Sequence, residues 1–419
     1  MIKLQLNKLL KNNFFKNSML YTIGAMLTPL IGLIMLPIYT NFLTTSEYAI
    51  MTTIQTLVGM LNLFLVLSLH GAITRFYYDF LDDPAKQKEY LSSIFSFVLI
   101  WASIVVVILY IFKEPIGSIL FKNIPTNPYF LYLIGISWVS ALYELPMALY
   151  RAREKAGMFV LVNVIKAISI MVVTMYLIIG KGFGAESALL SQFLITLIII
   201  FFTYGKQLKT FKFRINKNFV KASLLFSLPL LPHVASGWII NSSDRIILEK
   251  FIDLDDLGIY ALAIQVSMVL SIFYTSVNNA LVPRYTLLRK EEKFNEADKL
   301  LTYFSYIVLV FGVLSIPISM YAIKLFSSQE YHNAMVLMPL LLLGHMIKGF
   351  YFMPVAKLFY VKKTGAIATS SSIAAVTNIV VNLIAIPFIG IYGAIISTLI
   401  AEVIRYLMIL RASKILKKI

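Results

Sequence analysis

The sequence lacks cysteine and is poor in charged residues. No cysteine occurs among its 419 residues, which excludes disulfides and thiol chemistry but does not identify the compartment. Charged residues make up 14% of the chain, whereas hydrophobic residues make up 59% and the mean hydropathy is +0.83. A soluble domain has a larger charged share and a smaller apolar share, so most of this chain needs a nonpolar solvent.

The sequence also lacks the motifs of common catalytic sites. It contains no Walker loop, zinc-ligand motif or GxSxG motif. The longest loop expected on the outer side, 113–128, carries no constellation of acidic residues or arginines. We therefore expect a protein that is not an enzyme, with no cofactor and no metal site, and we do not expect ATP to be its direct fuel.

Long apolar runs fill most of the chain. The hydrocarbon core of a bilayer is ~30 Å thick and needs ~20 apolar residues per helix, and about twelve runs of that length are present. The sequence therefore predicts an all-α, multi-pass integral membrane protein. The expected spans are residues 18–42, 47–70, 90–112, 129–150, 158–179, 184–204, 222–249, 257–282, 299–323, 333–356, 365–388 and 391–411.

The segment before the first span has a different character. Residues 1–16 place leucines and lysines at helical spacing, which predicts an amphipathic segment that lies at the membrane interface. The apolar run that follows is too long for a cleavable signal peptide, and no small-residue cleavage site follows it. We expect this run to be the first membrane helix.

Basic residues are distributed unevenly between the two sides of the expected spans. Of the 37 lysines and arginines, three lie within spans (Lys166, Arg245, Lys348) and five lie on one side (Lys113, Lys122, Lys181, Lys250, Lys324), and the rest lie on the other side. This asymmetry predicts that the N-terminus and the C-terminus are both cytoplasmic. The formal charge of +17 is then explained by topology and anionic lipids, and no nucleic-acid partner is expected.

The chain repeats itself at half its length. NFLTTSEYAIMTTI, from Asn41, matches KFIDLDDLGIYALAI, from Lys250, and YLSSIFSFVLI, from Tyr90, matches KLLTYFSYIVL, from Lys299, both at an offset of 209 residues. Because each half holds an even number of spans, the repeats are parallel. The sequence predicts a six-helix lobe over 17–204, a basic cytoplasmic linker over 205–221, a second six-helix lobe over 222–412 and a basic tail over 413–419.

Two related lobes of this kind can rock against each other and expose a shared cavity to alternate sides of the membrane, as in many secondary transporters. Charged side chains at membrane depth cost ~2.5 kcal/mol or more, so they usually face a partner or a watery cavity. Lys166 and Lys348 are the strongest cavity candidates, because both lie far from the ends of their spans. His345 lies three positions before Lys348 and shares its helix face.

Other charged residues in the spans have simpler explanations beside the cavity hypothesis. Arg245, next to Asp244, has Glu249 as an i,i+4 partner that could neutralise it. Glu402 has Arg405 one turn away, which favours a structural ion pair. Glu144 lies at shallow depth and is not ranked above these.

Arg75 and Arg284 follow the second span of each half and are equivalent in the repeat. A guanidinium group suits a phosphate bidentately, so the two could bind one anionic headgroup at the cytoplasmic mouth. The alternative is that both are ordinary positive-inside anchors.

Prolines interrupt the first span of each half. Pro29 and Pro37 lie in the first span, and Pro229 and Pro232 lie in the seventh. Such kinks free backbone groups that only protein or a watery cavity can satisfy, so all four are hinge candidates. His233 follows Pro232 and either faces that cavity or packs with an ordinary hydrogen bond.

Two stretches of the sequence resemble a known family. KNSMLYTIGAMLTPLIGLIMLPIYTNFLTTSEYAIM at the start and SSDRIILEKFIDLDDLGIYALA in the seventh span and its sequel are similar to polysaccharide-export flippases of the Wzx type. These belong to the multidrug/oligosaccharidyl-lipid/polysaccharide exporter (MOP) superfamily, which has a MATE-like fold. The pair Asp244-Arg245, followed by an acidic turn and Gly258-Ile259-Tyr260, is the most specific part. The usual Tyr-Gly of the first half is Tyr48-Ala49 here.

The resemblance implies a flippase of the cytoplasmic (inner) membrane. Its substrate would be an undecaprenyl-pyrophosphate-linked oligosaccharide repeat unit for O-antigen or another surface polysaccharide. The sugar-pyrophosphate head would lie in a cationic cavity between two lobes, with Lys166 and Lys348 supplying positive charge. Asn241, Ser242, His345 and Tyr351 are candidates for contacting the sugar. H⁺ or Na⁺ would be the coupling ion, and membrane lipids, a polysaccharide polymerase and a chain-length regulator are candidate partners.

Two alternatives stay open. A multidrug antiporter of the same fold would export organic cations and would present buried carboxylates without compensating lysines. A membrane polysaccharide polymerase or glycosyltransferase would need a catalytic loop. The deep lysines argue against the first alternative, and the absence of such a loop argues against the second.

Overall fold

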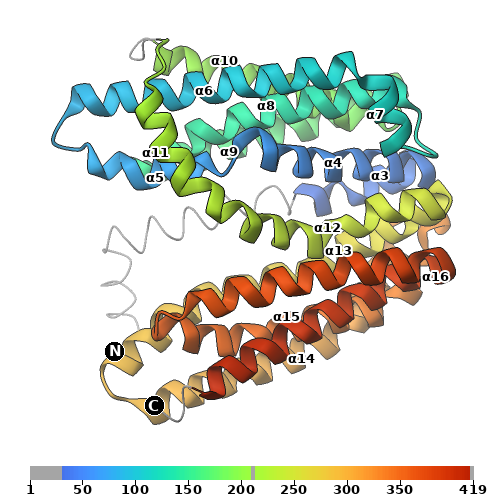
Figure 1. Cartoon of the computed structure of the whole chain (residues 1–419). Coiled ribbons are helices and arrows are strands. Elements are labelled where there is room, and N and C mark those ends of the chain that lie inside the picture. Colours follow the sequence, from blue (N-terminus) through green and yellow to red (C-terminus); the bar gives the residue numbers. More distant parts are fainter. Residues whose placement is uncertain (1–30, 209–212, 416–419) are drawn as a thin grey trace. The chain divides into compact units, whose positions relative to one another are not determined.

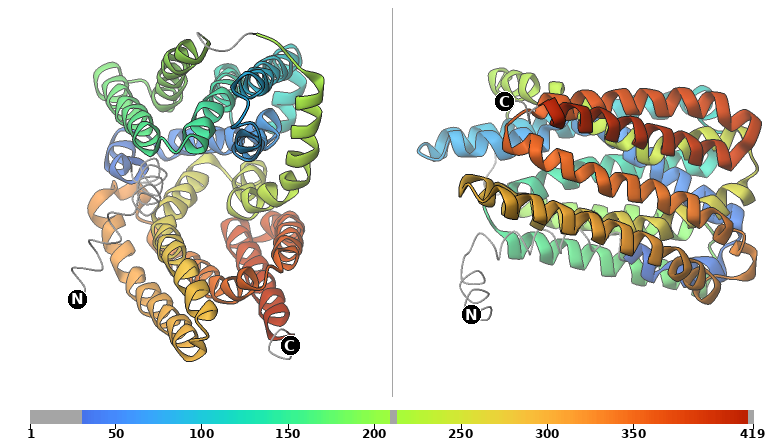
Figure 2. Two further views of the ribbon diagram at one scale, coloured as in Figure 1. Left: turned by 90° about the vertical axis from the view of Figure 1, so that its left-hand side faces the viewer. Right: turned by 90° about the horizontal axis from the view of Figure 1, so that it is seen from below.

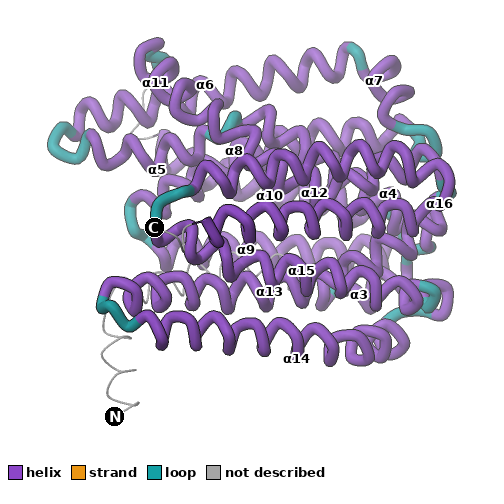
Figure 3. The backbone as a smooth tube through the Cα atoms, turned by 60° about the horizontal axis from the view of Figure 1, so that its bottom comes forward, coloured by secondary structure: helices purple, strands orange, loops and turns teal. Residues whose placement is uncertain are grey.

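The computed structural model describes residues 31–208 and 213–415, and this part of the chain consists of helices joined by short turns, without a strand (Figure 1). Only helices and closed barrels satisfy every backbone donor and acceptor in lipid, so a chain this apolar folds as helices. Figure 3 shows that loops form only a small share of the described chain. The helices are α3 (Leu36–Phe42), α4 (Thr45–Val66), α5 (Leu69–Asp79), α6 (Pro84–Ile111), α7 (Lys113–Leu120), α8 (Thr126–Ala152), α9 (Ala156–Met175), α10 (Glu186–Leu208), α11 (Lys217–Ser227), α12 (Leu231–Phe251), α13 (Leu254–Lys290), α14 (Phe294–Phe326), α15 (Ala334–Tyr360) and α16 (Thr364–Ile415).

Ten helical segments of the described residues are long and apolar enough to cross a membrane. The last of them, within α16, has non-helical backbone at Ile389 and at Gly390, where φ is +52°. Glycine reaches this left-handed region without the strain that a Cβ would add. The break divides α16 into two segments that correspond to the spans expected at 365–388 and 391–411. The all-α membrane fold is confirmed, and the total of twelve spans stays a prediction because residues 1–30 lie outside the described part.

Two of the expected spans are not continuous helices, because a break interrupts each of them. The span expected at 47–70 is interrupted between α4 and α5, where Leu67 and Ser68 have φ of 51° and 56°. The span expected at 222–249 is interrupted by a 3₁₀ turn, Leu228–Leu230, between α11 and α12. Pro229 lies within this second break and Pro232 follows it, and each proline removes a donor from the helical ladder.

Several helices begin at residues that favour helix starts. Asp83 accepts a hydrogen bond from the backbone of Lys86 and is followed by Pro84 in the first turn of α6. Asp253 caps α13 in the same way through the backbone of Asp256. Such caps satisfy backbone donors that have no partner within the helix and set where each helix begins.

The described residues group into two compact units. Unit 1 comprises 31–35 and Ile54–Pro232, and unit 2 comprises Leu36–Thr53 and 233–415. The helix α4 therefore contributes its first part to unit 2 and its second part to unit 1. Within each unit the long helices run along a common direction (Figure 2).

In unit 1, α8 lies at the centre and contacts α5, α6, α9 and α10. The core between these helices holds large apolar side chains such as Tyr90, Leu142 and Leu149, all of which are buried. The short helix α11 packs on α5 and α6. Outward-facing side chains are also apolar: Phe201 and Phe202 of α10 are 77% and 70% exposed, as expected for a lipid-facing surface.

In unit 2, α15 is central and contacts α13, α14 and α16. The segment Leu36–Thr53 joins this unit through polar contacts near one end of α13. The hydroxyls of Thr45 and Ser46 both donate to Asp255, the second at 2.7 Å. The hydroxyl of Tyr331 donates to the carbonyl oxygens of Leu43 and Thr44 at 3.3 Å and 3.0 Å.

The proline hinge candidates fall at different places. Pro37 lies in the first turn of α3, one residue after its start. Pro229 lies in the 3₁₀ turn and Pro232 in the first turn of α12. Pro29 and the interfacial segment expected at 1–16 lie outside the described residues. The hinge role of these prolines stays a prediction.

Candidate functional site

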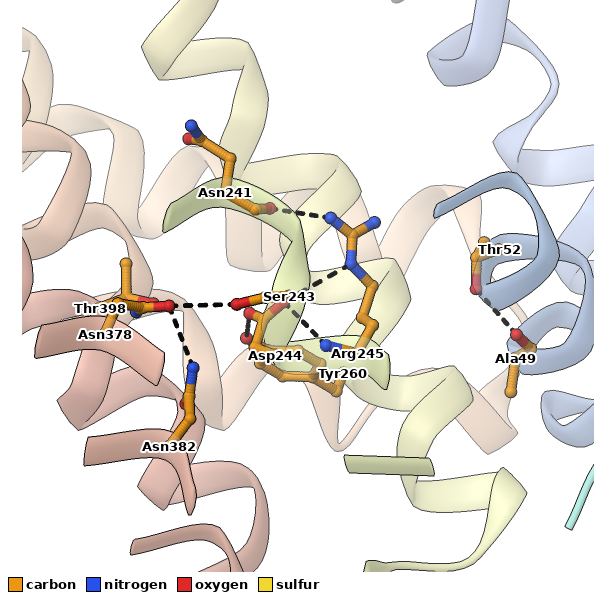
Figure 4. A network of polar contacts seen from close by, with 10 residues as sticks. All are labelled: Ala49, Thr52, Asn241, Ser243, Asp244, Arg245, Tyr260, Asn378, Asn382 and Thr398. Carbon is orange, nitrogen blue, oxygen red and sulfur yellow. Dashed lines mark hydrogen bonds and ion pairs between the residues drawn. The ribbon is translucent and has the colours of Figure 1, made fainter. Parts of the chain in front are cut away.

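Polar side chains inside the membrane-spanning helices gather into one cluster in each unit. In unit 2, Asp244 of α12 is the centre of the cluster and is 3% exposed. The hydroxyl of Tyr260, on α13, donates to its carboxylate (Figure 4). The backbone N–H of Arg245 donates to the same carboxylate at 2.8 Å, and the guanidinium Nε lies 3.7 Å from Oδ1. Asp244 is therefore both hydrogen-bonded and paired with a cation.

The Arg245 guanidinium has a second acceptor in its own helix. Its Nη2 donates to the backbone oxygen of Asn241 at 2.8 Å (Figure 4). Glu249 instead lies 3.3 Å from Lys250 in an ion pair. The cation at position 245 is thus neutralised by its neighbour in sequence, Asp244.

A row of amides extends from this cluster to both segments of α16. Ser243 Oγ donates to Asn378 Oδ1 at 3.2 Å, and Asn382 Nδ2 donates to the same oxygen at 3.1 Å. Asn378 Nδ2 donates to the hydroxyl of Thr398 at 3.4 Å (Figure 4). Asn378 and Asn382 are both 0% exposed, so these bonds replace the water that the amides lose on burial.

The lysine of α15 lies beside this network. Lys348 Nζ donates to Asn241 Oδ1 at 3.3 Å. His345, on the same helix face, lies 3.2 Å from the hydroxyl of Ser267 on α13. The expected proximity of His345 and Lys348 on one face is present, and Asn241 joins them from α12.

These residues line a small cavity with a volume of about 40 Å³. Its walls include Asn241, Asp244, His345, Lys348 and Glu402. A single water needs roughly 10–15 Å³ of such space, whereas small-molecule pockets usually measure about 300–1,000 Å³. The cavity has room for a few waters and none for a sugar.

Glu402 and Arg405 form the structural ion pair that their spacing predicts. Arg405 Nη2 donates to Glu402 Oε1 at 2.8 Å, and the two side chains are 3% and 7% exposed. The guanidinium also lies 4.3 Å from the ring centre of Tyr351. The charge of Arg405 is therefore compensated within α16, and Tyr351 is already engaged by a cation.

In unit 1, the corresponding lysine packs against an aromatic ring. Lys166 Nζ of α9 lies 3.9 Å from the ring centre of Tyr143 on α8. The Tyr143 hydroxyl donates to Asn163 Oδ1 at 3.1 Å, which fixes the ring. A cation over a ring face is attracted by the ring quadrupole, and its charge is not cancelled by that contact.

Glu144 is the acidic residue of this unit 1 cluster. Asn62 Nδ2 of α4 donates to its Oε1 at 2.6 Å, and His70 Nδ1 of α5 lies 3.4 Å from its Oε2. The side chains of His70 and Glu144 are 34% and 37% exposed. The break at Leu67 and Ser68 brings His70 to this carboxylate, since it separates α4 from α5.

The two arginines matched by the repeat differ in their surroundings. Arg75 forms an ion pair with Asp79 one turn away, and its side chain is 55% exposed. Arg284 is exposed on α13. Asp79 competes with any phosphate for the guanidinium of Arg75. Of the two arginines, Arg284 is the one that forms no ion pair among residues 31–208 and 213–415. The phosphate role of both stays a prediction.

The remaining predicted residue, His233, is exposed in the first turn of α12. Sequence reasoning missed five uncharged members of the unit 2 cluster. A usable signal exists for two of them, because Asn378 and Asn382 are four residues apart in an otherwise apolar run and so share a helix face. The other missed members are Ser243, Tyr260 and Thr398.

Metal-binding clusters were not expected, and the described residues contain no group of three or more His, Asp or Glu side chains that could hold a metal ion. The polar groups present are ammonium, guanidinium, amide, hydroxyl and paired carboxylate. These groups can bind an anion or a hydroxylated ligand, and none of the arrangements described above assembles a nucleophile with a base.

Comparison with protein families gives one match to most of the chain. The model of the family described as "Polysaccharide biosynthesis protein" matches residues 14–288. Two curated relatives are the Lsg locus protein 1 of Haemophilus influenzae, 24% identical over 67% of this chain and 67% of its own length, and the capsular polysaccharide biosynthesis protein CapF of Staphylococcus aureus, 23% identical over 63% and 66%. The alignments thus span about two thirds of each relative.

Solved structures with a similar fold are membrane transporters. The lipid II flippase MurJ in an inward closed conformation superposes with a TM-score of 0.76 at 17% identity, covering 94% of this chain and 87% of MurJ. An inward-facing MATE-family multidrug resistance transporter of the MOP superfamily gives a TM-score of 0.70 at 15% identity, covering 95% and 99%. At these identities the likeness establishes the fold alone, which this chain shares with these transporters.

Proposed function

Because this chain belongs to the family described as polysaccharide biosynthesis protein, we propose that it is a flippase for a lipid-linked oligosaccharide. Its substrate is an undecaprenyl-pyrophosphate-linked repeat unit, which moves from the inner to the outer leaflet of the cytoplasmic membrane for O-antigen or another surface polysaccharide. The protein acts by alternating access of two lobes and performs no covalent chemistry. One relative named for capsular polysaccharide biosynthesis supports the pathway.

One observation supports an anionic substrate: two lysines at membrane depth form no ion pair with a carboxylate among the described residues. Among the described residues neither Lys166 nor Lys348 forms an ion pair, whereas Arg245 pairs with Asp244 and Arg405 pairs with Glu402. The contacts of the lysines are the Tyr143 ring and the Asn241 amide oxygen. An unpaired ammonium inside a membrane helix is costly, so a transported anion is the partner that repays it.

The magnitude of the interaction suits a diphosphate. Two unit charges 4 Å apart attract by about 4 kcal/mol at an effective dielectric constant of ~20. Transfer of an unpaired anion into a low-dielectric region costs far more than that, so several such contacts are needed along the path. Lys166 in one unit and Lys348 in the other supply one contact each, and Arg284 is a further candidate at the cytoplasmic end of α13.

The sugar needs hydroxyl and amide partners beside these cations. Asn241, Ser242, His345 and Tyr351 are the candidates that the sequence suggests. Asn241 and Tyr351 are already engaged, by Lys348 and Arg405 respectively, so a bound sugar must exchange with these contacts. The cavity of about 40 Å³ beside Lys348 is too small for the sugar, so the repeat unit occupies a space that opens during the cycle.

The cycle also needs an energy source, for which we propose a coupling ion, H⁺ or Na⁺. Asp244 and His345 line the small cavity of unit 2, where water or a small ion fits. The carboxylate already has Tyr260 and Arg245 as partners, so an ion that binds there competes with Arg245 for its charge. A polymerase and a chain-length regulator remain candidate partners.

The test replaces each lysine in a strain that lacks its own flippase for the same polysaccharide. Lys166→Gln and Lys348→Gln should each reduce surface polysaccharide, and Lys→Arg at the same positions should retain more of it, because the charge is kept. Membrane abundance is measured for each variant, and Lys113→Gln, in the first turn of α7 and outside both polar clusters, serves as the matched control. Full complementation by both Gln variants at normal abundance would remove these lysines from transport.

An organic-cation antiporter of the same fold is the competing hypothesis. It would need an accessible carboxylate without a cationic partner. Asp244 and Glu402 are paired with arginines, and Glu144 already binds Asn62 and lies beside His70. The observed pairing therefore favours an anionic cargo.

A further inference from the structure

A second hollow on the molecule lies outside the polar clusters described above, on unit 1. It is an open groove of about 380 Å³ formed along α11, with a wall from α6. Its lining is almost wholly apolar and includes Phe97, Val220, Leu224 and Leu225, and two lysines, Lys217 and Lys221, lie at one end. We call this the α11 groove. Its volume falls in the range of small-ligand pockets.

The groove is formed by a helix that polar contacts hold in place. The side chain of Asn216 caps α11 and its Nδ2 donates to Glu89 Oε1 of α6 at 2.9 Å. The backbone N–H of Asn216 donates to Ser93 Oγ at 3.0 Å. About two turns further along α11, Ser223 Oγ lies 3.2 Å from the hydroxyl of Tyr90, which is buried in the core. The groove is therefore a fixed feature of unit 1.

Along the groove, charged side chains come first and apolar side chains follow, which matches the headgroup and acyl chains of a phospholipid. The lysines lie in the first two turns of α11, and apolar side chains follow toward Leu228, eleven residues after Lys217, which is about 16 Å along a helix. Leu225 and Leu228 are 68% and 44% exposed. Apolar side chains this exposed are unfavourable in water and are stable against lipid acyl chains. The expected orientation puts the start of α11 on the cytoplasmic side, where the leaflet is anionic.

The two lysines are available to a headgroup. They are four residues apart and so lie on one helix face, and both are exposed. Within the part of the chain that the structure describes, neither forms an ion pair. The carboxylate of Glu89, which contacts the start of α11, accepts a hydrogen bond from Asn216. A phosphate between them would gain two ammonium donors at the level of the membrane surface.

We propose that the α11 groove binds one anionic phospholipid of the inner leaflet. An acyl chain lies against Phe97, Val220 and Leu224, and the headgroup phosphate lies between Lys217 and Lys221. The lipid fills the groove between α6 and α11 and stabilises the entry of the chain into α12. This assignment does not rest on the flippase proposal, and it holds or fails independently of what the protein transports.

The test measures lipid retained by the purified full chain in native mass spectrometry, with phosphatidylglycerol and phosphatidylcholine of identical acyl chains. The wild-type chain should retain one phosphatidylglycerol in preference to phosphatidylcholine. Each basic residue near a membrane surface contributes roughly a factor of five, so the double variant Lys217→Gln/Lys221→Gln should weaken phosphatidylglycerol binding by about 30-fold. Lys362→Gln/Lys363→Gln, an exposed pair on unit 2, is the matched control and should leave retention unchanged.

A second variant tests the apolar part. Leu224→Trp fills the groove and should reduce retention of both lipids; where it fails to fold, Leu225→Gln, at a side chain that is 68% exposed, replaces it. Unchanged retention in the lysine variant, equal loss in the control variant, or unchanged retention in the groove variant overturns the assignment. Stronger retention of undecaprenyl phosphate than of phosphatidylglycerol at equal concentration would also overturn it, because the occupant would then be the isoprenoid lipid.

Discussion

The close approach of α13 to Thr45, the first residue of α4, predicts a severe effect of one methyl group. At Gly258, an added Cβ would lie 2.0 Å from the backbone oxygen of Thr45 and 2.7 Å from its carbonyl carbon. Both obstacles are backbone atoms, so no side chain can rotate away. The substitution Gly258→Ala must therefore move α13 relative to the start of α4 within unit 2. This explains in physical terms why the motif Gly258-Ile259-Tyr260 begins with glycine.

The magnitude follows from two contributions. Overpacking of a close contact costs typically 1–3 kcal/mol, and the hydroxyls of Thr45 and Ser46 lose their bonds to the Asp255 carboxylate, each of which is worth about 1.5–3 kcal/mol as a hydrogen bond to a charged group. Partial relaxation keeps the total below the sum, so we expect about 2–4 kcal/mol of destabilisation. This is large beside the usual effect of a single substitution.

The assay is thermal unfolding of the purified protein in detergent, followed by intrinsic tryptophan fluorescence. Gly258→Ala should unfold at a clearly lower temperature than the wild type. Gly237→Ala on α12 is the matched control, because nothing lies within 4 Å of its added Cβ and alanine favours a helix over glycine. Equal unfolding temperatures for Gly258→Ala and the wild type would refute the close approach of α13 and Thr45.

Two further substitutions test hydrogen bonds of unit 2. Tyr260→Phe removes the side-chain donor to the buried Asp244 carboxylate and should destabilise the protein by about 1–3 kcal/mol, measured by the same unfolding assay; an unchanged unfolding temperature would show that water replaces the hydroxyl there. Tyr331→Phe should cost about 0.5–1.5 kcal/mol by removing the donor to Leu43 and Thr44. Burial raises the pKa of Tyr331 above its ordinary value of 10.0, so the phenol stays protonated in the folded chain. Its contribution should be constant below pH 10 and should decline as the pH rises above that value, and a difference between wild type and Tyr331→Phe that grows above pH 10 would contradict this.

The membrane helices follow from the sequence because their signal is composition over long windows. An apolar run of about twenty residues has few alternatives to a helix in lipid, and the expected spans from 90 onward coincide with described helices within a few residues at most ends. The break near Pro229 and Pro232 was signalled by the prolines. The break at Leu67 and Ser68 was not, because neither residue type favours the left-handed backbone that both adopt.

The site could be predicted only where charge marks it. A lysine in an apolar run attracts notice, and Lys166 and Lys348 do lie in polar surroundings. The partners of a charge are harder to derive, since helical spacing favours Glu249 for Arg245 and the structure instead pairs Arg245 with Asp244. The amides of Asn378 and Asn382 were missed because uncharged polar residues also occur in spans without any role, and their bonds to Ser243 and Thr398 depend on tertiary packing.

Transport itself is measured as the flipping rate of a pyrophosphate-linked oligosaccharide lipid in proteoliposomes that contain the purified protein. We expect the double variant Lys166→Gln/Lys348→Gln to flip this lipid at least about tenfold more slowly than the wild type, since each lost contact is worth up to about 4 kcal/mol. The double Arg variant should keep most of the rate. A rate for the double Gln variant equal to that of the wild type, at equal amounts of folded protein, would contradict the proposal that Lys166 and Lys348 carry the anionic head across.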